Sequence, residues 1–264
     1  MNLLITNSKC LVIPGVNQIK DEVDSIVFLN DTLFKSLLEL KKLGKIKYNR
    51  VYIANDNPYL LCLITFYVYV FKSRKVTLFF QELYDVYIKI FFLIKFTLKL
   101  ADEVIIPSYN RKIATKLIYG YNGLFIVMLN KRHSGNSKDS SIEKNKSNYV
   151  YTGVLFPQRD ILKGIQTIDE AVDVYGAGNS DYIKRLRLNK KVNYKGGFIQ
   201  SNEIAIVSKY NTGVLYYPMN SINNTLCSPN KFFTYDDLKL TIHCESPNIF
   251  KSLITYNKIK RPLC

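Results

Sequence analysis

A short apolar run that ends in glycine decides the fold: Tyr149-Val150-Tyr151-Thr152-Gly153. The same pattern of a short run followed by glycine occurs at Ala171–Tyr175, followed by Gly176-Ala177-Gly178, and at Val192–Tyr194, followed by Gly196-Gly197. Runs this short and continuous are typical of strands buried on both faces of a parallel sheet. Glycine after such a strand lets the backbone approach a ligand at the carboxyl edge of the sheet, although each glycine alone is more often a simple turn.

The first half of the chain alternates in the same way. Helical patterns lie between its apolar runs, such as Thr32–Leu43 and Asn110–Ile118. Strict alternation of strand and helix predicts an α/β fold in which helices cover both faces of a parallel sheet. The other predicted strands are Leu3–Thr6, Ser25–Leu29, Val51–Ala54, Val76–Phe80, Val104–Pro107, Phe125–Leu129, Gly213–Tyr217 and Leu240–His243.

A change of composition separates the two halves. Residues 131–148 are rich in lysine, serine and asparagine and contain almost no apolar residue, which predicts a linker or an exposed loop. The chain of 264 residues is long enough for two small domains. We therefore expect one doubly wound domain over 1–130 and a second over 149–264.

The net charge of +16, from 37 basic and 21 acidic residues, predicts a surface that attracts anions. Nucleic acid, an acidic membrane and phosphorylated small molecules all fit this charge. The basic residues lie in separate patches with no known nucleic-acid reader motif, so nucleic acid is not expected as a partner. The five cysteines lack CxxC spacing and there are only two histidines. Free thiols in a reducing cytosol are therefore expected, with no metal site and no histidine-centred triad.

Two apolar segments are candidates for membrane contact. Leu60–Phe71 is too short to span a bilayer and predicts a buried core helix. Tyr84–Leu100 has more apolar surface than one core-facing stripe needs, together with Lys89, Lys95 and Lys99. It fits either a helix on an anionic membrane surface or a helix buried on several sides. Because the N-terminus predicts a first strand and not a signal peptide, we expect a cytoplasmic protein, with peripheral attachment to the inner face of the cell membrane as a hypothesis.

A candidate anion site lies at Ser228-Pro229-Asn230-Lys231-Phe232-Phe233. Ser228 is a favoured helix N-cap, and Pro229 suits the first helical position. A helix N-terminus carries unpaired amides and a partial positive charge, and Lys231 adds a full charge. The segment therefore predicts a phosphate site, with an ordinary capped helix and a solvated lysine as the alternative.

These segments resemble, in order and spacing, the nucleotide-sugar-binding domain of GT-B glycosyltransferases. The resemblance is carried by Gly153 to Arg159, by the glycine turn at Gly176 to Gly178 and by the Ser-Pro-Asn-Lys segment at 228–231. In the first half, Phe80–Asp85 and Ala101–Ser108 add to it. The chain is most similar to the retaining family 4 enzymes of bacterial surface-polysaccharide synthesis, which make capsule or lipopolysaccharide.

The resemblance implies two Rossmann-like domains that face a cleft, here reduced in size. It implies transfer of a sugar from a nucleotide-diphosphate sugar to a lipid-linked oligosaccharide, with retention of configuration. The nucleotide-sugar is the donor substrate, and no cofactor is implied. No metal ion is implied either, which agrees with the absence of an Asp-x-Asp pair.

The resemblance also assigns roles to single residues. Gly153 is expected to lie against the donor phosphates with its amide exposed, and Arg159 to neutralise the diphosphate. Glu82, Arg159 and Lys231 are the expected catalytic residues. The other expected donor-binding residues are Lys163 as a second cation, Gly176 and Gly178 around the nucleotide, Asn223 as a further polar contact, and Ser228 and Asn230 at the diphosphate and sugar.

The chain departs from the family pattern at three positions. Leu226 and Thr234 stand where the family has two glutamates, the second of which binds the ribose, and Gln81 stands where a histidine is frequent. These departures leave open an alternative: a degenerate, non-catalytic relative that acts as a partner subunit.

Overall fold

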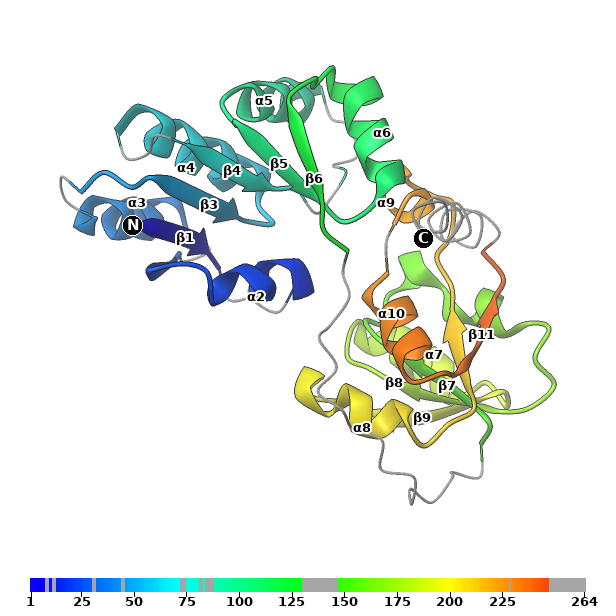
Figure 1. The fold of residues 1–264 in the computed structure, drawn as a ribbon. Coiled ribbons are helices and arrows are strands. Elements are labelled where there is room, and N and C mark those ends of the chain that lie inside the picture. Colours follow the sequence, from blue (N-terminus) through cyan, green and yellow to red (C-terminus); the bar gives the residue numbers. More distant parts are fainter. Residues whose placement is uncertain are drawn as a thin grey trace, which may run out of the picture. The chain divides into compact units, whose positions relative to one another are not determined.

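The computed structural model describes residues 1–7, 10, 13–29, 32–43, 46–71, 75–80, 83, 88–129, 147–227 and 229–246. The chain forms two compact units, Met1–Asn130 and Lys131–Cys264, here called unit 1 and unit 2. Of the predicted linker, only Ser147 and Asn148 belong to the described residues. Figure 1 shows the two sheets and the helices that cover them.

Unit 1 is built on a six-stranded parallel sheet in the order β2-β1-β3-β4-β5-β6. The chain runs out from β1 to β2 at one edge, returns to β3 beside β1, and then continues to the other edge. Its elements are β1 (Asn2–Thr6), α2 (Pro14–Lys20), β2 (Ser25–Phe28), α3 (Leu33–Lys42), β3 (Arg50–Ala54), α4 (Pro58–Phe71), β4 (Val76–Phe79), α5 (Ile88–Lys99), β5 (Glu103–Ile106), α6 (Tyr109–Tyr119) and β6 (Leu124–Val127).

Alternation along the strands divides the core of unit 1 between two faces. Leu4, Tyr52 and Phe79 point to the face that α2 covers with Val16 and Ile19. Neighbouring side chains on each strand point to the opposite face, and α4 packs against β3 and β4 there. The four inner strands, β1, β3, β4 and β5, are buried on both faces, which explains their continuous apolar sequence, whereas the edge strands β2 and β6 are only partly buried.

Unit 2 contains a five-stranded parallel sheet in the order β11-β10-β7-β8-β9. The first strand of the unit, β7, lies in the middle, with β8 on one side and β10 on the other. Its elements are β7 (Tyr149–Thr152), η1 (Pro157–Arg159), η2 (Ile161–Ile165), β8 (Val172–Tyr175), α7 (Ser180–Arg187), β9 (Val192–Gly196), η3 (Gln200–Asn202), α8 (Glu203–Val207), β10 (Thr212–Leu215), α9 (Ile222–Thr225), α10 (Asn230–Asp237) and β11 (Thr241–Cys244).

Both faces of this second sheet are also covered. On one face, η2 and α7 pack against β7, β8 and β10, in a cluster that includes Tyr151, Ile161 and Tyr182. On the other, Val207 of α8 and Tyr235 of α10 pack against Val150. The ring of Tyr235 occupies the space that a side chain at position 213 would need, so Gly213 lets α10 approach β10 closely.

The structure confirms the fold class predicted from the sequence. All eleven predicted strands form, with ends that differ by at most two residues, and helices alternate with them in both units. The sheets are parallel throughout, as expected for strands that are apolar along their whole length.

The prediction of a buried core helix at Leu60–Phe71 is wrong in part. One face of α4 is buried through Leu60, Ile64 and Val68, but Phe66 and Phe71 on its other side are exposed. Only one side of the helix contacts the sheet, so its uniformly apolar sequence leaves aromatic side chains on the surface. Among the described residues, no helix is long and apolar enough to cross a membrane.

Candidate functional site

The candidate site of unit 2 lies where the strand order reverses. β7 and β10 are neighbours, but the chain leaves them toward opposite edges of the sheet. In open parallel sheets, ligands bind at the carboxyl ends of the two strands at such a switch point. Here Gly153 follows β7 directly, and Tyr217 comes two residues after β10.

Lys231, in the first turn of α10, reaches this point. The residue is only 8% exposed, and its ammonium lies over the ring of Tyr151, 3.8 Å from the ring centroid. The ring of Tyr217 is 5.6 Å from the same nitrogen. The negative faces of two aromatic rings therefore attract the ammonium, which offsets part of its loss of hydration.

The absence of a side chain at Gly153 makes room for Lys231. A Cβ atom at this position would lie 2.8 Å from the Lys231 ammonium and 3.5 Å from the Tyr151 hydroxyl. The backbone of Gly153 has φ of 145°, which other residues rarely adopt. Its N–H donates to the carbonyl of Tyr175 at 3.0 Å. The exposed amide expected at Gly153 is therefore wrong, because that amide continues the pairing of β7 with β8.

A second cation approaches the same rings. The guanidinium of Arg159, at the end of η1, lies 5.3 Å from the centroid of the Tyr217 ring. The next residue, Asp160, accepts a hydrogen bond from the Tyr182 hydroxyl at 3.0 Å, and the same hydroxyl accepts from the Ile161 amide at 2.8 Å. Since Tyr182 is buried in the core, these bonds fix the loop that carries Arg159.

Tyr217 is held through its backbone. Its N–H donates to the Ser246 hydroxyl at 2.8 Å, and that hydroxyl donates to the Tyr217 carbonyl at 2.9 Å. Burial raises the pKa of the Tyr217 hydroxyl well above its usual range, and the nearby Cys227 adds to this. The phenol therefore stays neutral at physiological pH and is a hydrogen-bond donor. The Tyr217 ring lies near both cations, Arg159 and Lys231, and its backbone is held in place by Ser246.

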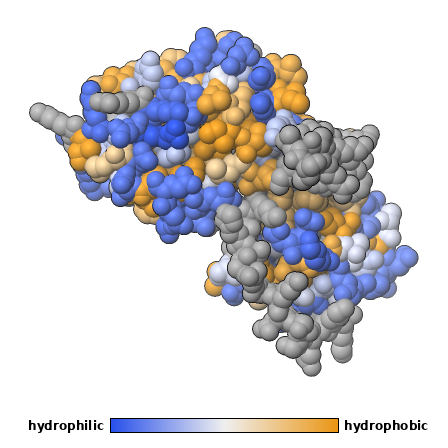
Figure 2. Space-filling view, viewed as in Figure 1, coloured by the Kyte–Doolittle hydropathy of each residue, from blue (hydrophilic) through white to orange (hydrophobic). Residues whose placement is uncertain are grey.

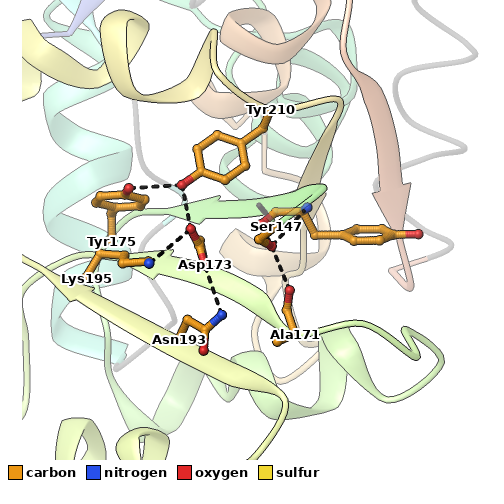
Figure 3. A network of polar contacts seen from close by, with 8 residues as sticks. Ser147, Ala171, Asp173, Tyr175, Asn193, Lys195 and Tyr210 are labelled. Carbon is orange, nitrogen blue, oxygen red and sulfur yellow. Dashed lines mark hydrogen bonds and ion pairs between the residues drawn. The ribbon is translucent and has the colours of Figure 1, made fainter. Parts of the chain in front are cut away.

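Two buried carboxylates among the described residues, Asp173 and Glu103, have partners of opposite charge. Figure 3 shows Asp173, which accepts from Tyr210 at 2.8 Å and from Asn193 at 3.1 Å and forms an ion pair with Lys195 at 3.4 Å. In unit 1, Glu103 pairs with Lys75 and with Arg50. Burial opposes ionisation of Glu103, but the hydrogen bond from Lys75 and the charge of Arg50 lower its pKa.

Lys231 differs from these groups. Within the part of the chain that the structure describes, its ammonium has neither a hydrogen bond nor an ion pair. A charge that loses part of its hydration without gaining a hydrogen-bonded counterion is unfavourable, and aromatic faces offset only part of that cost. An anion bound between Lys231 and Arg159 would supply the missing partner. The geometry therefore defines a candidate anion site.

The structure brings together only some of the predicted site residues. Lys231, Arg159 and Gly153 meet at the switch point, and Asn230 begins α10 beside them. Lys163 is exposed on η2, and no contact between described residues ties it to this group. Asn223 lies on α9, in the connection between β10 and α10.

The structure explains why positions 176 and 178 are glycine. A Cβ atom at either position would collide with the backbone carbonyl of Gly153 or Leu155, so both glycines allow this close approach of the two strand ends. A role around a nucleotide stays a prediction for them. Glu82 and Ser228 lie outside the described residues. The expected helix start is wrong by one residue, because Pro229 has the extended conformation of an N-cap and α10 begins at Asn230.

Sequence reasoning missed Tyr151 and Tyr217 as parts of the site. Both positions were visible as aromatic residues near the ends of the two central strands. Their function as a cage for Lys231 depends on the side-chain packing of three elements, which no local pattern records. Thr234, at a position where a glutamate was expected, is buried and donates to the Asn230 carbonyl at 3.4 Å.

No protein-family model and no curated protein matches the chain. Solved structures do. The chain is similar to HepE of Anabaena, solved in complex with UDP and glucose, with 14% identity and a TM-score of 0.50 over 80% of this chain and 73% of that one. An alpha-glucosyltransferase in complex with UDP-glucose and DNA has 14% identity and a TM-score of 0.49 over 81% and 72%. A glycosyltransferase from Rickettsia africae has 12% identity and a TM-score of 0.47 over 80% and 72%. At these identities the similarity concerns the fold, and it agrees with the two parallel α/β sheets described above.

One expectation about partners needs correction. The sequence was taken to exclude nucleic acid, because its basic residues form no reader motif. Alpha-glucosyltransferases among the similar structures were solved in complex with DNA. The exclusion of nucleic acid was therefore wrong. The absence of a known reader motif does not exclude nucleic-acid binding, because the known reader motifs belong to other folds.

The substitution Gly153→Ala tests the geometry of the site. We expect its methyl group to displace the Lys231 ammonium and to weaken the binding of inorganic pyrophosphate or UDP by about tenfold or more, the value of a charged hydrogen bond. Isothermal titration calorimetry measures the affinity.

Gly196→Ala is the matched control. Gly196 also has a positive φ, 98°, but a Cβ atom there meets nothing within 4 Å. Both variants should lose stability through backbone strain, by about 1–3 kcal/mol. Only Gly153→Ala should lose anion affinity, and equal affinities in the two variants would contradict the assigned position of the anion.

Proposed function

We propose that the chain is a glycosyltransferase that binds a nucleotide-diphosphate sugar at the switch point of unit 2. The observation that carries the proposal is the ammonium of Lys231, a residue only 8% exposed, which faces Gly153, contacts two aromatic rings and has no hydrogen bond or ion pair among the described residues. The resemblance of the sequence to GT-B enzymes supports it. The presence of UDP in complexes of HepE and of the alpha-glucosyltransferase makes UDP-sugars the first donors to test.

The chemistry of sugar transfer explains why cations lie at this place. As the bond between the sugar and the diphosphate breaks, negative charge grows on the leaving phosphate oxygen. Preorganised cations stabilise that charge most strongly where water is excluded. In the proposal, Lys231 takes this role from inside the protein and Arg159 assists from the loop after β7. No metal ion or cofactor has a part in it, and retention of configuration rests on the resemblance alone.

Lys231→Ala is expected to leave the fold intact and to abolish transfer or donor binding. Removal of a charge-assisted contact to the diphosphate should weaken UDP binding by about tenfold to a hundredfold. The alanine also removes a charge that has no ion-pair partner among the described residues, so the melting temperature should not fall sharply. Calorimetry with UDP and a transfer assay with a panel of UDP-sugars measure the two effects.

Lys184→Ala is the control for loss of one positive charge. Lys184 is exposed on α7 and forms a surface pair with Asp181, so UDP affinity should not change. Wild-type turnover in Lys231→Ala would refute the site. Binding of UDP-sugars without transfer to any acceptor would favour the alternative of a non-catalytic partner subunit.

The proposed acceptor is a lipid-linked oligosaccharide of surface-polysaccharide synthesis, and an exposed apolar area of unit 1 supports it. Phe92 and Phe96 of α5 are 64% and 46% exposed, and the Phe96 ring lies 6.4 Å from that of Phe66 on α4. Lys95 and Lys99 belong to the same helix. Figure 2 shows that hydrophobic residues reach the surface of unit 1. Exposed aromatic residues beside lysines favour peripheral binding to an anionic membrane.

Liposome flotation tests the membrane part of the proposal. Wild type should float with vesicles that contain phosphatidylglycerol, and the triple variant Phe92→Ser, Lys95→Glu, Lys99→Glu should not. Each lysine near the lipid surface is worth about 1 kcal/mol, so charge reversal alone should have a clear effect. Leu188→Ser, at an 86% exposed position of unit 2, is the control and should float as wild type does. Equal flotation of all three proteins would exclude this surface.

A further inference from the structure

One edge of the unit 2 sheet forms a groove. β9 is the last strand in the sheet order, and β8 is its only partner among the described strands. A groove of about 760 Å³ lies at this strand, lined by its four consecutive residues 192–195 and by Arg187 at the end of α7. Side chains of successive residues in a strand point to opposite faces, so a groove that touches all four follows the edge of the strand.

The backbone of β9 turns hydrogen-bonding groups toward this edge. The Val172 amide donates to the Lys191 carbonyl at 2.9 Å, so that carbonyl faces β8. Backbone groups alternate between the two edges of a strand, and counting from Lys191 turns the N–H and C=O of Tyr194 outward. No described strand lies on that side to pair with them. An extended segment of another chain can therefore add to the sheet here.

The same edge is strongly basic. The segment 184–195 contains six lysine and arginine residues and no acidic residue. The Arg187 guanidinium lies over the Tyr194 ring, 4.9 Å from its centroid, and has no carboxylate partner among the described residues. Figure 3 shows Lys195 directed toward the buried Asp173 carboxylate, at 3.4 Å, and 43% of its side chain is exposed. Both cations line the groove and can receive carboxylates.

We propose that the edge of β9 is a docking site for an acidic, extended segment of a partner protein, which adds to the sheet as a further strand. The backbone of the segment pairs with the outward N–H and C=O of Tyr194, and its carboxylates bind Arg187 and Lys195. Main-chain hydrogen bonds supply affinity in this mode of recognition, and the side-chain contacts supply specificity. The inference goes beyond the proposed function and does not depend on it, because β8 separates this strand from the switch point.

Charge favours an acidic partner over a second copy of the chain. An exposed edge strand invites edge-to-edge pairing between copies, and basic side chains at the edge oppose it. In such a pair, Arg187 and Lys195 of one copy would approach the same residues of the other, and like charges across a strand pair are unfavourable. The same side chains attract an acidic segment and speed its encounter with the groove.

A pool of synthetic hexapeptides tests the docking site on the full chain. The peptides are acetylated and amidated and carry three glutamates in varied positions among valines and threonines. We expect members of the pool to bind wild type and to slow hydrogen exchange of the Tyr194 amide by about tenfold or more, because that amide then donates to the peptide. NMR measures both effects. A pool of the same composition with every amide N-methylated keeps the charge but cannot pair as a strand, and it should not bind.

Arg187→Glu tests the contribution of charge. Loss of a charge-assisted hydrogen bond should weaken peptide binding by about tenfold. Lys184→Glu is the matched control, because Lys184 lies on the same helix, forms a surface pair with Asp181 and does not line the groove. An exposed pair of this kind contributes little, so peptide affinity should stay within about twofold of wild type. Melting curves show that both variants are folded.

Four results would overturn the docking site. Absence of binding by every peptide of the pool would exclude it. Equal binding of the N-methylated pool would indicate a simple anion site without strand pairing. Equal loss of affinity in Arg187→Glu and Lys184→Glu would indicate attraction by the general positive charge, as nucleic acid would also experience. Protection of the Tyr194 amide without peptide, together with dimers in sedimentation, would indicate that a second copy occupies the edge.

Discussion

The candidate site of unit 2 is organised around one charge, the ammonium of Lys231. This ammonium lies over the ring of Tyr151, near the ring of Tyr217 and against Gly153, with no anion among the described residues to pair with it. The residue is 8% exposed and has lost much of its hydration, which the two rings offset only in part. Gly153 leaves room for the ammonium, Tyr182 holds the loop of Arg159, and backbone hydrogen bonds to Ser246 hold Tyr217. An anionic ligand at this point would supply the missing partner.

Both sheets reverse their strand order once, between β1 and β3 in unit 1 and between β7 and β10 in unit 2. In open parallel sheets, ligands bind at such points. At the switch point of unit 2, Lys231 and Arg159 lie against aromatic rings, an arrangement that favours an anionic ligand. The Asp56 carboxylate lies at the switch point of unit 1, so the two points differ in charge.

Much of the fold could be predicted from the sequence, because buried parallel strands need continuous apolar runs and their glycine ends are visible as residues. All the strands were found in this way. The site was predicted only in part. Lys231 stood out at a predicted helix N-terminus and Arg159 through the resemblance to GT-B enzymes, but the cage of Tyr151 and Tyr217 depends on packing between elements far apart in sequence. The Gly153 amide was misjudged because its bond to Tyr175 depends on strand pairing. The surface of α4 was misjudged because an apolar sequence does not show how many of its sides find a partner.

A crystal structure of the chain with an intact UDP-sugar tests the central claim most directly. The account predicts a diphosphate oxygen within hydrogen-bond distance of Lys231 Nζ, with the Arg159 guanidinium turned toward the same phosphates and Gly153 beside them. A diphosphate bound elsewhere on unit 2, with Lys231 still enclosed only by Tyr151 and Tyr217, would contradict it.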